Sequence, residues 1–148
     1  MKDYAGGYTF YPKESKSIYR VSTKKQYDKL RDDIPMQKKV CHEFAERQGW
    51  IIVGEVYEKG ISGYKVSAEK RDAIQALKQS AENGEFDILL VFMFDRIGRI
   101  DDETPCVVEW FIKHGIEVWS TQEGQQKLEN QGDKIVNYVR FFAGEYRK

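Results

Sequence analysis

One hydroxyl and one arginine occur together where the sequence suits chemistry on a phosphate. Arg20 and Ser22 lie two residues apart at the end of a short apolar segment. In a β-strand, residues at this spacing point to the same side, so the guanidinium would lie beside the hydroxyl. A cation in that position neutralises a phosphate and favours the developing alkoxide of the nucleophile. The competing interpretation is that Ser22 simply ends a strand.

A second charged group follows a continuous apolar run. Asp95, Arg96 and Arg99 come directly after the apolar residues 88–94. The two arginines are three residues apart, so they would converge if the segment coils into a turn. Asp95 would then orient one guanidinium. The alternative is a solvated charge cluster that pairs with the acidic residues following it, and the residues alone favour neither interpretation.

A glycine-containing loop and a nearby arginine form a third group. Gly60, Ser62 and Gly63 lie in this loop, and Arg71 follows near the start of a predicted helix. Glycine permits a tight loop, and a helix start stabilises an anion. Taken alone, Arg71 is more simply a surface residue. Taken together, the groups offer arginine forks that can neutralise a phosphate without a metal. Metal-ligand spacing of His, Cys and Asp is absent from the sequence, so no metal or other cofactor is predicted.

Alternating strand and helix patterns must position these groups. Strands are predicted at residues 18–21, 50–57, 86–94 and 116–120, and helices at 34–48, 67–82, 103–114 and from 132 onward. In the first helix, Met36, Val40 and Phe44 are expected to face the core. Residues 1–16 show no period and are interpreted as a loose extension, and residues 121–131 as a mobile connection.

This alternation predicts an α/β fold, a three-layer sandwich with a mostly parallel sheet. The order that we expect for its strands is 2-1-3-4, a hypothesis that the alternation allows and that makes the first and third strands neighbours. Ligands of such sheets bind beyond the carboxyl ends of the strands. The group at Ser22 and the group at Asp95 are therefore expected to face each other.

Length and composition fit one globular domain. The chain has 148 residues, 41% hydrophobic and 32% charged. It has neither an apolar run that could span a bilayer nor a signal-peptide core, so we expect a cytoplasmic protein with no membrane partner. Its 24 basic and 24 acidic residues cancel, which counts against strong DNA affinity of this segment by itself. Cys41 and Cys106 are too few for a disulfide framework and are interpreted as reduced thiols in or near the core.

In order and spacing, these motifs resemble the catalytic domain of the resolvase/invertase family of serine recombinases. Residues 19–26, Tyr-Arg-Val-Ser-Thr-Lys-Lys-Gln, are similar to the family's nucleophile motif. Residues 60–63 resemble its Gly-x-Ser-Gly loop, and residues 94–99, Phe-Asp-Arg-Ile-Gly-Arg, its arginine signature. The resemblance covers residues 17–148. It implies an extension over 1–16, a resolvase-like catalytic domain over 17–131 and, over 132–148, the truncated start of a long dimerisation helix.

The resemblance implies a site-specific DNA recombinase. Ser22 would attack a DNA phosphodiester to give a 5′-phosphoserine link and a free 3′-hydroxyl, followed by strand exchange and religation. The implied catalytic residues are Ser22, Arg20, Arg71, Asp95, Arg96 and Arg99, and the residues implied to support the site or bind DNA phosphate are Gln26, Gln37 and Ser62. Neither metal nor ATP would be needed. The implied partners are DNA and further copies of the protein, as a homodimer that forms a synaptic tetramer.

Some features depart from the family pattern, and two other functions stay open. Glu58 stands where the family often has Asp, and the interval from Gln26 to Gln37 is more like that of the large serine recombinases. We expect a longer protein in which a DNA-binding module follows Lys148. The first alternative is a metal-dependent Toprim-like nuclease using Asp95 and Glu58, which magnesium dependence would reveal. The second is a catalytically silent recombinase-derived regulator, against which the retained serine and four arginines argue.

The last predicted helix carries more apolar surface than its own domain can cover. Ile135, Val139 and Phe142 form a stripe at helical spacing, with Tyr138 and Phe141 beside it. A helix apolar over this much of its girth needs burial on more than one side. Exposed apolar patches usually mark partner sites, so we expect an association surface.

Overall fold

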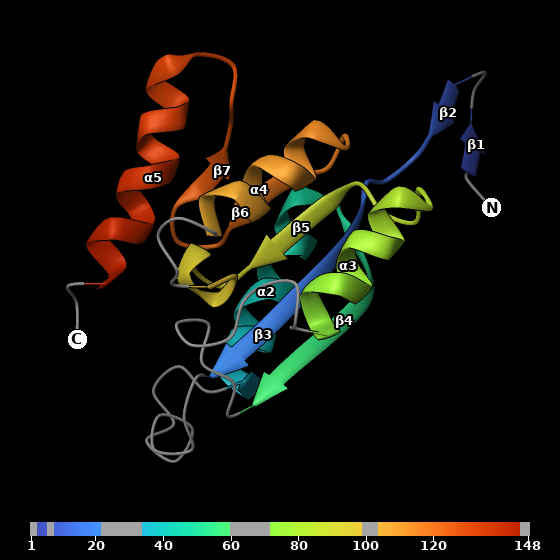
Figure 1. Ribbon diagram of the computed structural model, residues 1–148. Coiled ribbons are helices and arrows are strands. Elements are labelled where there is room, and N and C mark those ends of the chain that lie inside the picture. Colours follow the sequence, from blue (N-terminus) through green and yellow to red (C-terminus); the bar gives the residue numbers. More distant parts are fainter. Residues whose placement is uncertain (1–2, 6–7, 22–33, 60–71, 99–103, 146–148) are drawn as a thin grey trace.

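The computed structural model describes residues 3–5, 8–21, 34–59, 72–98 and 104–145 (Figure 1). One sheet holds five strands in the order β4-β3-β5-β6-β7. These are β3 (Glu14–Val21), β4 (Ile51–Lys59), β5 (Ile88–Val91), β6 (Glu117–Ser120) and β7 (Gly124–Gln126). The first four pair in parallel, and β7 joins β6 antiparallel. The predicted α/β class and the 2-1-3-4 order are thus confirmed, with β7 as an added edge strand.

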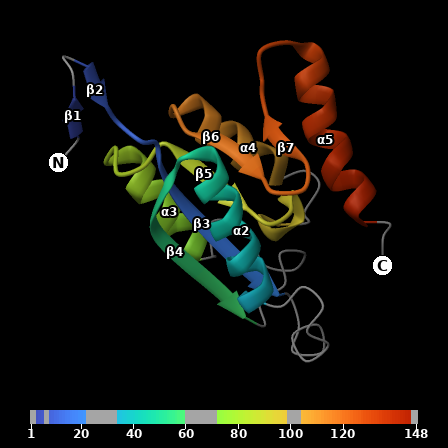
Figure 2. The ribbon, with the colours of Figure 1, turned by 180° about the vertical axis from the view of Figure 1, so that it is seen from behind.

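Helices cover both faces of this sheet (Figures 1 and 2). They are α2 (Ile34–Gln48), α3 (Asp72–Glu82), α4 (Thr104–Lys113) and α5 (Gln131–Glu145). The core under α3 and α4 includes Ile74, Leu77, Val108 and Phe111 packed with Ile18 and Leu89. The core under α2 includes Ile34, Cys41 and Ala45 packed with Tyr19 and Leu90. The three layers predicted from the alternation are therefore present.

Strand β5 lies at the centre of the molecule and is buried on both faces. Leu89 and Val91 belong to the core under α3 and α4, and Ile88 and Leu90 to the core under α2. A continuous apolar run is typical of such a parallel strand. The strand ends earlier than predicted, because the chain leaves the sheet after Val91 and coils into a 3-10 turn, η2 (Phe94–Arg96).

The buried face of α2 differs from the predicted one. Gln37 is fully buried together with Ile34, Cys41 and Ala45, whereas the predicted stripe of Met36, Val40 and Phe44 is only half-buried. The prediction was incomplete because it considered apolar residues only, although Phe44 does pack against this core as a partly buried side chain. Hydrogen bonds to the backbone of β3, described below, compensate the burial of this amide.

Two segments predicted to lack regular structure contain strands. In the segment interpreted as a loose extension, β1 (Asp3–Ala5) pairs antiparallel with β2 (Tyr8–Phe10) in a separate sheet, and β3 begins at Glu14. In the segment interpreted as a mobile connection, β7 returns along β6. Gly124 permits that reversal, with a φ of 84°.

Two further sequence inferences concern the cysteines and the membrane. Cys41 is buried, as expected, but Cys106 is exposed on α4, so its assignment to the core or its border was wrong. Both thiols are free. Within the described ranges, none of the helices combines the length and the apolar character that crossing a bilayer requires.

Candidate active site

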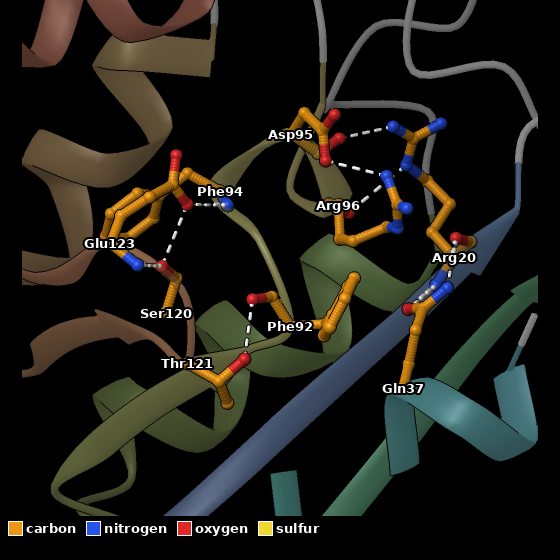
Figure 3. A network of polar contacts seen from close by, with 9 residues as sticks. All are labelled: Arg20, Gln37, Phe92, Phe94, Asp95, Arg96, Ser120, Thr121 and Glu123. Carbon is orange, nitrogen blue, oxygen red and sulfur yellow. Dashed lines mark hydrogen bonds and ion pairs between the residues drawn. The ribbon is translucent and has the colours of Figure 1, made fainter. Parts of the chain in front are cut away.

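Four of the predicted site residues come together at the carboxyl ends of β3 and β5 (Figure 3). Arg20 lies near the end of β3, Asp95 and Arg96 lie in η2, and Gln37 lies in the first turns of α2. The other predicted site residues lie outside the described part of the chain: Ser22, Gln26, Ser62, Arg71 and Arg99. The described residues at the ends of the first and third strands thus lie together, as expected.

Arg20 joins the two strand ends. Its side chain is only 2% exposed. Its Nε donates a hydrogen bond to the carbonyl oxygen of Arg96 at 3.1 Å, and its Nη2 donates to the carbonyl oxygen of Asp95. A buried guanidinium needs such hydrogen bonds to offset its loss of hydration. The position of η2 relative to β3 is therefore set by Arg20.

Within η2, Asp95 orients Arg96. Arg96 Nη1 donates to Asp95 Oδ1 at 2.6 Å, and the Arg96 side chain is 6% exposed. The guanidinium carbon lies 5.8 Å from the centre of the Phe92 ring. A solvated charge cluster would leave these side chains in water, so the structure favours the ordered alternative for this pair. Their catalytic role stays a prediction.

Gln37 holds the end of β3 from the helix side. Its Nε2 donates to the carbonyl oxygen of Arg20 at 3.1 Å, and its Oε1 accepts from the backbone N–H of Arg20 at 3.3 Å. The pairing of β3 with β5 ends at Ser17, three residues earlier. The amide of Gln37 thus satisfies the backbone groups of Arg20 beyond the end of the β5 ladder.

Glu58 lies on β4, on the other side of this strand end. It pairs in register with Arg20 across β3 and β4 and is buried. Asp95, the second acid that a metal-dependent nuclease would use, binds Arg96 instead. In the parts of the chain with described side chains, His, Cys, Asp and Glu do not gather in groups of three or more that could hold a metal ion.

The face of β3 opposite Arg20 carries a separate polar cluster. Tyr19 Oη donates to Glu55 Oε2 at 2.6 Å, and the same oxygen lies 2.7 Å from His42 Nε2. Burial, followed by the hydrogen bond to Glu55, raises the pKa of Tyr19 above its usual range. Burial also raises the pKa of Cys41 to about 12. Tyr19 therefore stays a neutral hydrogen-bond donor that fixes β3 against β4.

The sequence analysis missed a second set of polar contacts at this edge. Glu123 Oε1 accepts from the backbone N–H of Phe94 at 2.9 Å and from Ser120 Oγ at 2.8 Å (Figure 3). Thr121 Oγ1 donates to the carbonyl oxygen of Phe92 at 2.8 Å. Ser120 ends the fourth parallel strand, and Thr121 and Glu123 follow it. The rule that drew attention to Ser22 and Asp95, polar residues after a strand's carboxyl end, would have identified them as well.

Comparisons with known proteins agree with this geometry. Residues 17–148 match the family model described as the resolvase N-terminal domain. The N-terminal catalytic domain of TP901-1 integrase is similar in structure, with a TM-score of 0.71, 27% identity, and coverage of 90% of this chain and 96% of that one. A resolvase family site-specific recombinase from Streptococcus pneumoniae gives a TM-score of 0.68 at 20% identity, covering 89% of this chain and 88% of that one. At that identity the likeness shows the fold alone.

A third structure shares the fold at lower similarity. The C-terminal catalytic domain of ISC1926 TnpA, an IS607-like serine recombinase, gives a TM-score of 0.60 at 19% identity, covering 89% of this chain and 84% of that one. No match was found among curated protein sequences. Because the family model matches nearly the whole chain, this protein belongs to the resolvase N-terminal domain family of serine recombinases.

Proposed function

We propose that this protein is the catalytic domain of a site-specific DNA recombinase and that Ser22 is its nucleophile. The observation that carries the proposal is that the Arg20 side chain extends from β3 to the turn after β5. This residue lies two positions before Ser22, and its buried guanidinium binds the turn that holds Asp95 and Arg96. The nucleophile segment and the arginine segment, distant in sequence, are thereby joined at one edge of the sheet, where open α/β sheets bind their ligands.

The proposed reaction is a phosphoryl transfer to serine. The Ser22 oxygen loses its proton and bonds to phosphorus, while the bond from phosphorus to the 3′-oxygen breaks and that oxygen takes up a proton. The phosphoserine ester conserves the energy of the phosphodiester, so a 3′-hydroxyl of the exchanged strand can reverse the step. Arg20, Arg71, Arg96 and Arg99 would neutralise the phosphate oxygens, and Asp95 would hold Arg96 in place. The proposed reaction uses no metal or nucleotide.

The proposed assembly uses α5. Its apolar residues Ile135 and Val139 are 61% and 56% exposed. Among the α5 side chains that the structure describes, Asn137 is buried against the domain and donates to the carbonyl oxygen of Pro105 at 3.1 Å. The exposure of these apolar residues supports the proposed homodimer, in which a second copy would cover them, and two dimers on DNA would form the proposed tetramer. We expect this to take place in the cytoplasm, where the DNA substrate would lie.

Covalent capture of DNA tests the proposal. The protein is incubated, with EDTA present, with DNA fragments from the cell that encodes it, and the reaction is stopped with detergent. We expect covalent protein–DNA adducts whose peptide map places the nucleotide on Ser22. Ser22→Ala should abolish the adducts. Ser80→Ala should retain them, because Ser80 lies on α3 and binds Lys16, near the opposite end of β3.

Three results would overturn the proposal. Adducts that survive in Ser22→Ala would assign the nucleophile to another residue. Cleavage that is lost in EDTA and restored by magnesium would favour the metal-dependent nuclease. A wild-type protein that binds DNA but never forms an adduct would favour the silent regulator.

A further inference from the structure

We propose that Glu123 is a positioning residue that holds the η2 turn in its catalytic geometry. This inference rests on the proposed function of Asp95 and Arg96. Glu123 lies in the turn between β6 and β7, 29 residues after Phe94 and outside the motifs. Its carboxylate reaches back to the first residue of η2 (Figure 3).

The carboxylate supplies a cap that the local sequence lacks. The first N–H groups of a helical turn have no partner within the turn. Met93, the residue before η2, makes no side-chain cap hydrogen bond. Glu123 Oε1 accepts the Phe94 N–H at 2.9 Å instead. A distant segment of the chain therefore caps the turn.

Charges of opposite sign hold the two ends of η2. The anionic Glu123 binds the N–H group at its start, and the cationic Arg20 binds the carbonyl oxygens of Asp95 and Arg96. This arrangement matches the polarity of the peptide groups, since N–H ends attract anions and carbonyl ends attract cations. Arg20 lies on β3 and binds the end of the turn, whereas Glu123 lies after β6 and binds its start. Removing either side chain therefore leaves one end of the turn without this contact.

Glu123 is itself held in place. Ser120 Oγ donates to Glu123 Oε1 at 2.8 Å and accepts the backbone N–H of Glu123 at 2.8 Å. Next to it, the backbone N–H of Thr121 donates to the carbonyl oxygen of Val91 at 2.9 Å. One oxygen of the carboxylate thus accepts two hydrogen bonds. The backbone beside Glu123 is also hydrogen-bonded to the end of β5. A side chain fixed in this way can impose a position on Phe94, which a mobile surface glutamate cannot.

The ring of Phe94 is held independently of its backbone. The Arg140 guanidinium carbon of α5 lies 4.6 Å from the centre of the ring, and Arg140 Nη1 donates to Gln126 Oε1 at 2.8 Å. The ring is buried. Loss of the Glu123 carboxylate should therefore leave Phe94 packed and the domain folded, while the start of η2 gains freedom to rotate.

Amide hydrogen exchange and NMR spectroscopy test whether Glu123 fixes the start of η2, in the isolated protein and without any DNA. In Glu123→Ala we expect the Phe94 amide to exchange about ten- to hundredfold faster, because a charge-assisted hydrogen bond is lost. The Arg20 Nε–H signal should shift, because its acceptor is the carbonyl oxygen of Arg96. Glu123→Gln should retain most of the wild-type behaviour, since the amide oxygen can accept both donors. Glu129→Ala is the matched control, an exposed carboxylate in the connection between β7 and α5.

The rate of covalent adduct formation then tests the catalytic consequence. We expect Glu123→Ala to slow it by about tenfold or more, because small displacements of catalytic groups have large effects on rate. Glu123→Gln and Glu129→Ala should react within about twofold of the wild type. Ser120→Ala, which frees the carboxylate without removing it, should show the same changes at a smaller size and serves if Glu123→Ala fails to fold.

The outcomes separate this proposal from the proposed function. Unchanged exchange at Phe94 in Glu123→Ala and Ser120→Ala would overturn the hold on η2, whatever the activity. Altered exchange with an adduct rate equal to that of the wild type would overturn the positioning role. A wild type that forms no adducts would refute the proposed function, and the exchange data would then still report whether Glu123 holds the turn.

Discussion

Replacing Gln37 by alanine should destabilise the protein by about 2–4 kcal/mol. The side chain makes two hydrogen bonds to the backbone of Arg20, at 3.1 and 3.3 Å, and both residues are buried. The substitution leaves one N–H and one carbonyl group without this partner, and each unsatisfied buried group costs about 1–3 kcal/mol. Entry of water into the space left by the amide would reduce the sum, so we take the lower part of the range.

The corresponding change in melting temperature can be measured directly. For a domain of this size, 1 kcal/mol shifts the midpoint by about 2–4 °C, so Gln37→Ala should melt about 5–15 °C below the wild type. Urea unfolding followed by tryptophan fluorescence gives the free energy itself. Lys39→Ala, at an exposed position two residues further along α2, is the matched control and should change stability by less than about 0.5 kcal/mol.

Gln37→Glu separates the two hydrogen bonds. A carboxylate oxygen can still accept the Arg20 N–H, but the second oxygen faces the Arg20 carbonyl and cannot donate to it. Burial disfavours the charged form, so the carboxyl of this variant should titrate above its unfolded value of about 4.3. The penalty is therefore full at neutral pH and shrinks as the pH falls, because the protonated carboxyl can donate to the carbonyl again.

One result would contradict this role of Gln37. If Gln37→Ala loses less than about 0.5 kcal/mol and the Arg20 amide remains as protected from exchange as in the wild type, the amide does not hold the strand end.

Three other predictions concern different parts of the molecule. Burial of the Glu55 carboxyl acts to raise its pKa, but hydrogen bonds from Tyr19 and His42 outweigh it and the pKa lies below the usual 4.5. Glu55 thus stabilises the fold above that pH, and Glu55→Gln should cost about 1 kcal/mol at pH 7 in urea unfolding, a difference that disappears as the pH falls below 4.5. A thiol reagent should label Cys106 in the native protein and Cys41 only after unfolding, because Cys41 is buried and Cys106 exposed; two reactive thiols in the native protein would contradict this. Val139→Glu should weaken self-association in sedimentation runs over a concentration series without lowering the melting temperature, and a wild type that is monomeric throughout would refute the association surface.

Local patterns were enough to predict the framework of the site. The alternation of apolar segments with amphipathic ones predicted the layers, because a parallel sheet covered by helices needs that alternation wherever it occurs. The 2-1-3-4 order was a hypothesis that the alternation allows but does not require. The run 88–94 predicted a buried central strand, and the positions of Arg20 and Asp95 after two such strands predicted that they would meet. These inferences depend on periodicity and on strand polarity, both of which are properties of neighbouring residues.

The polar contacts that fix the site were decided by the tertiary structure. Gln37 and Glu123 are residue types that usually lie in water, so nothing in their immediate sequence distinguishes a buried amide or a capping carboxylate from a solvated one. Their partners are 17 and 29 residues away. A hydrogen bond of this kind depends on the distance and angle between two groups, which are set only when β3, α2 and the turn after β6 have packed together. The sequence alone therefore determined which strands meet and which charges they carry, because periodicity is a property of neighbouring residues. The packed fold determined how those charges are held, because a hydrogen bond requires two distant groups to be brought within about 3 Å of each other.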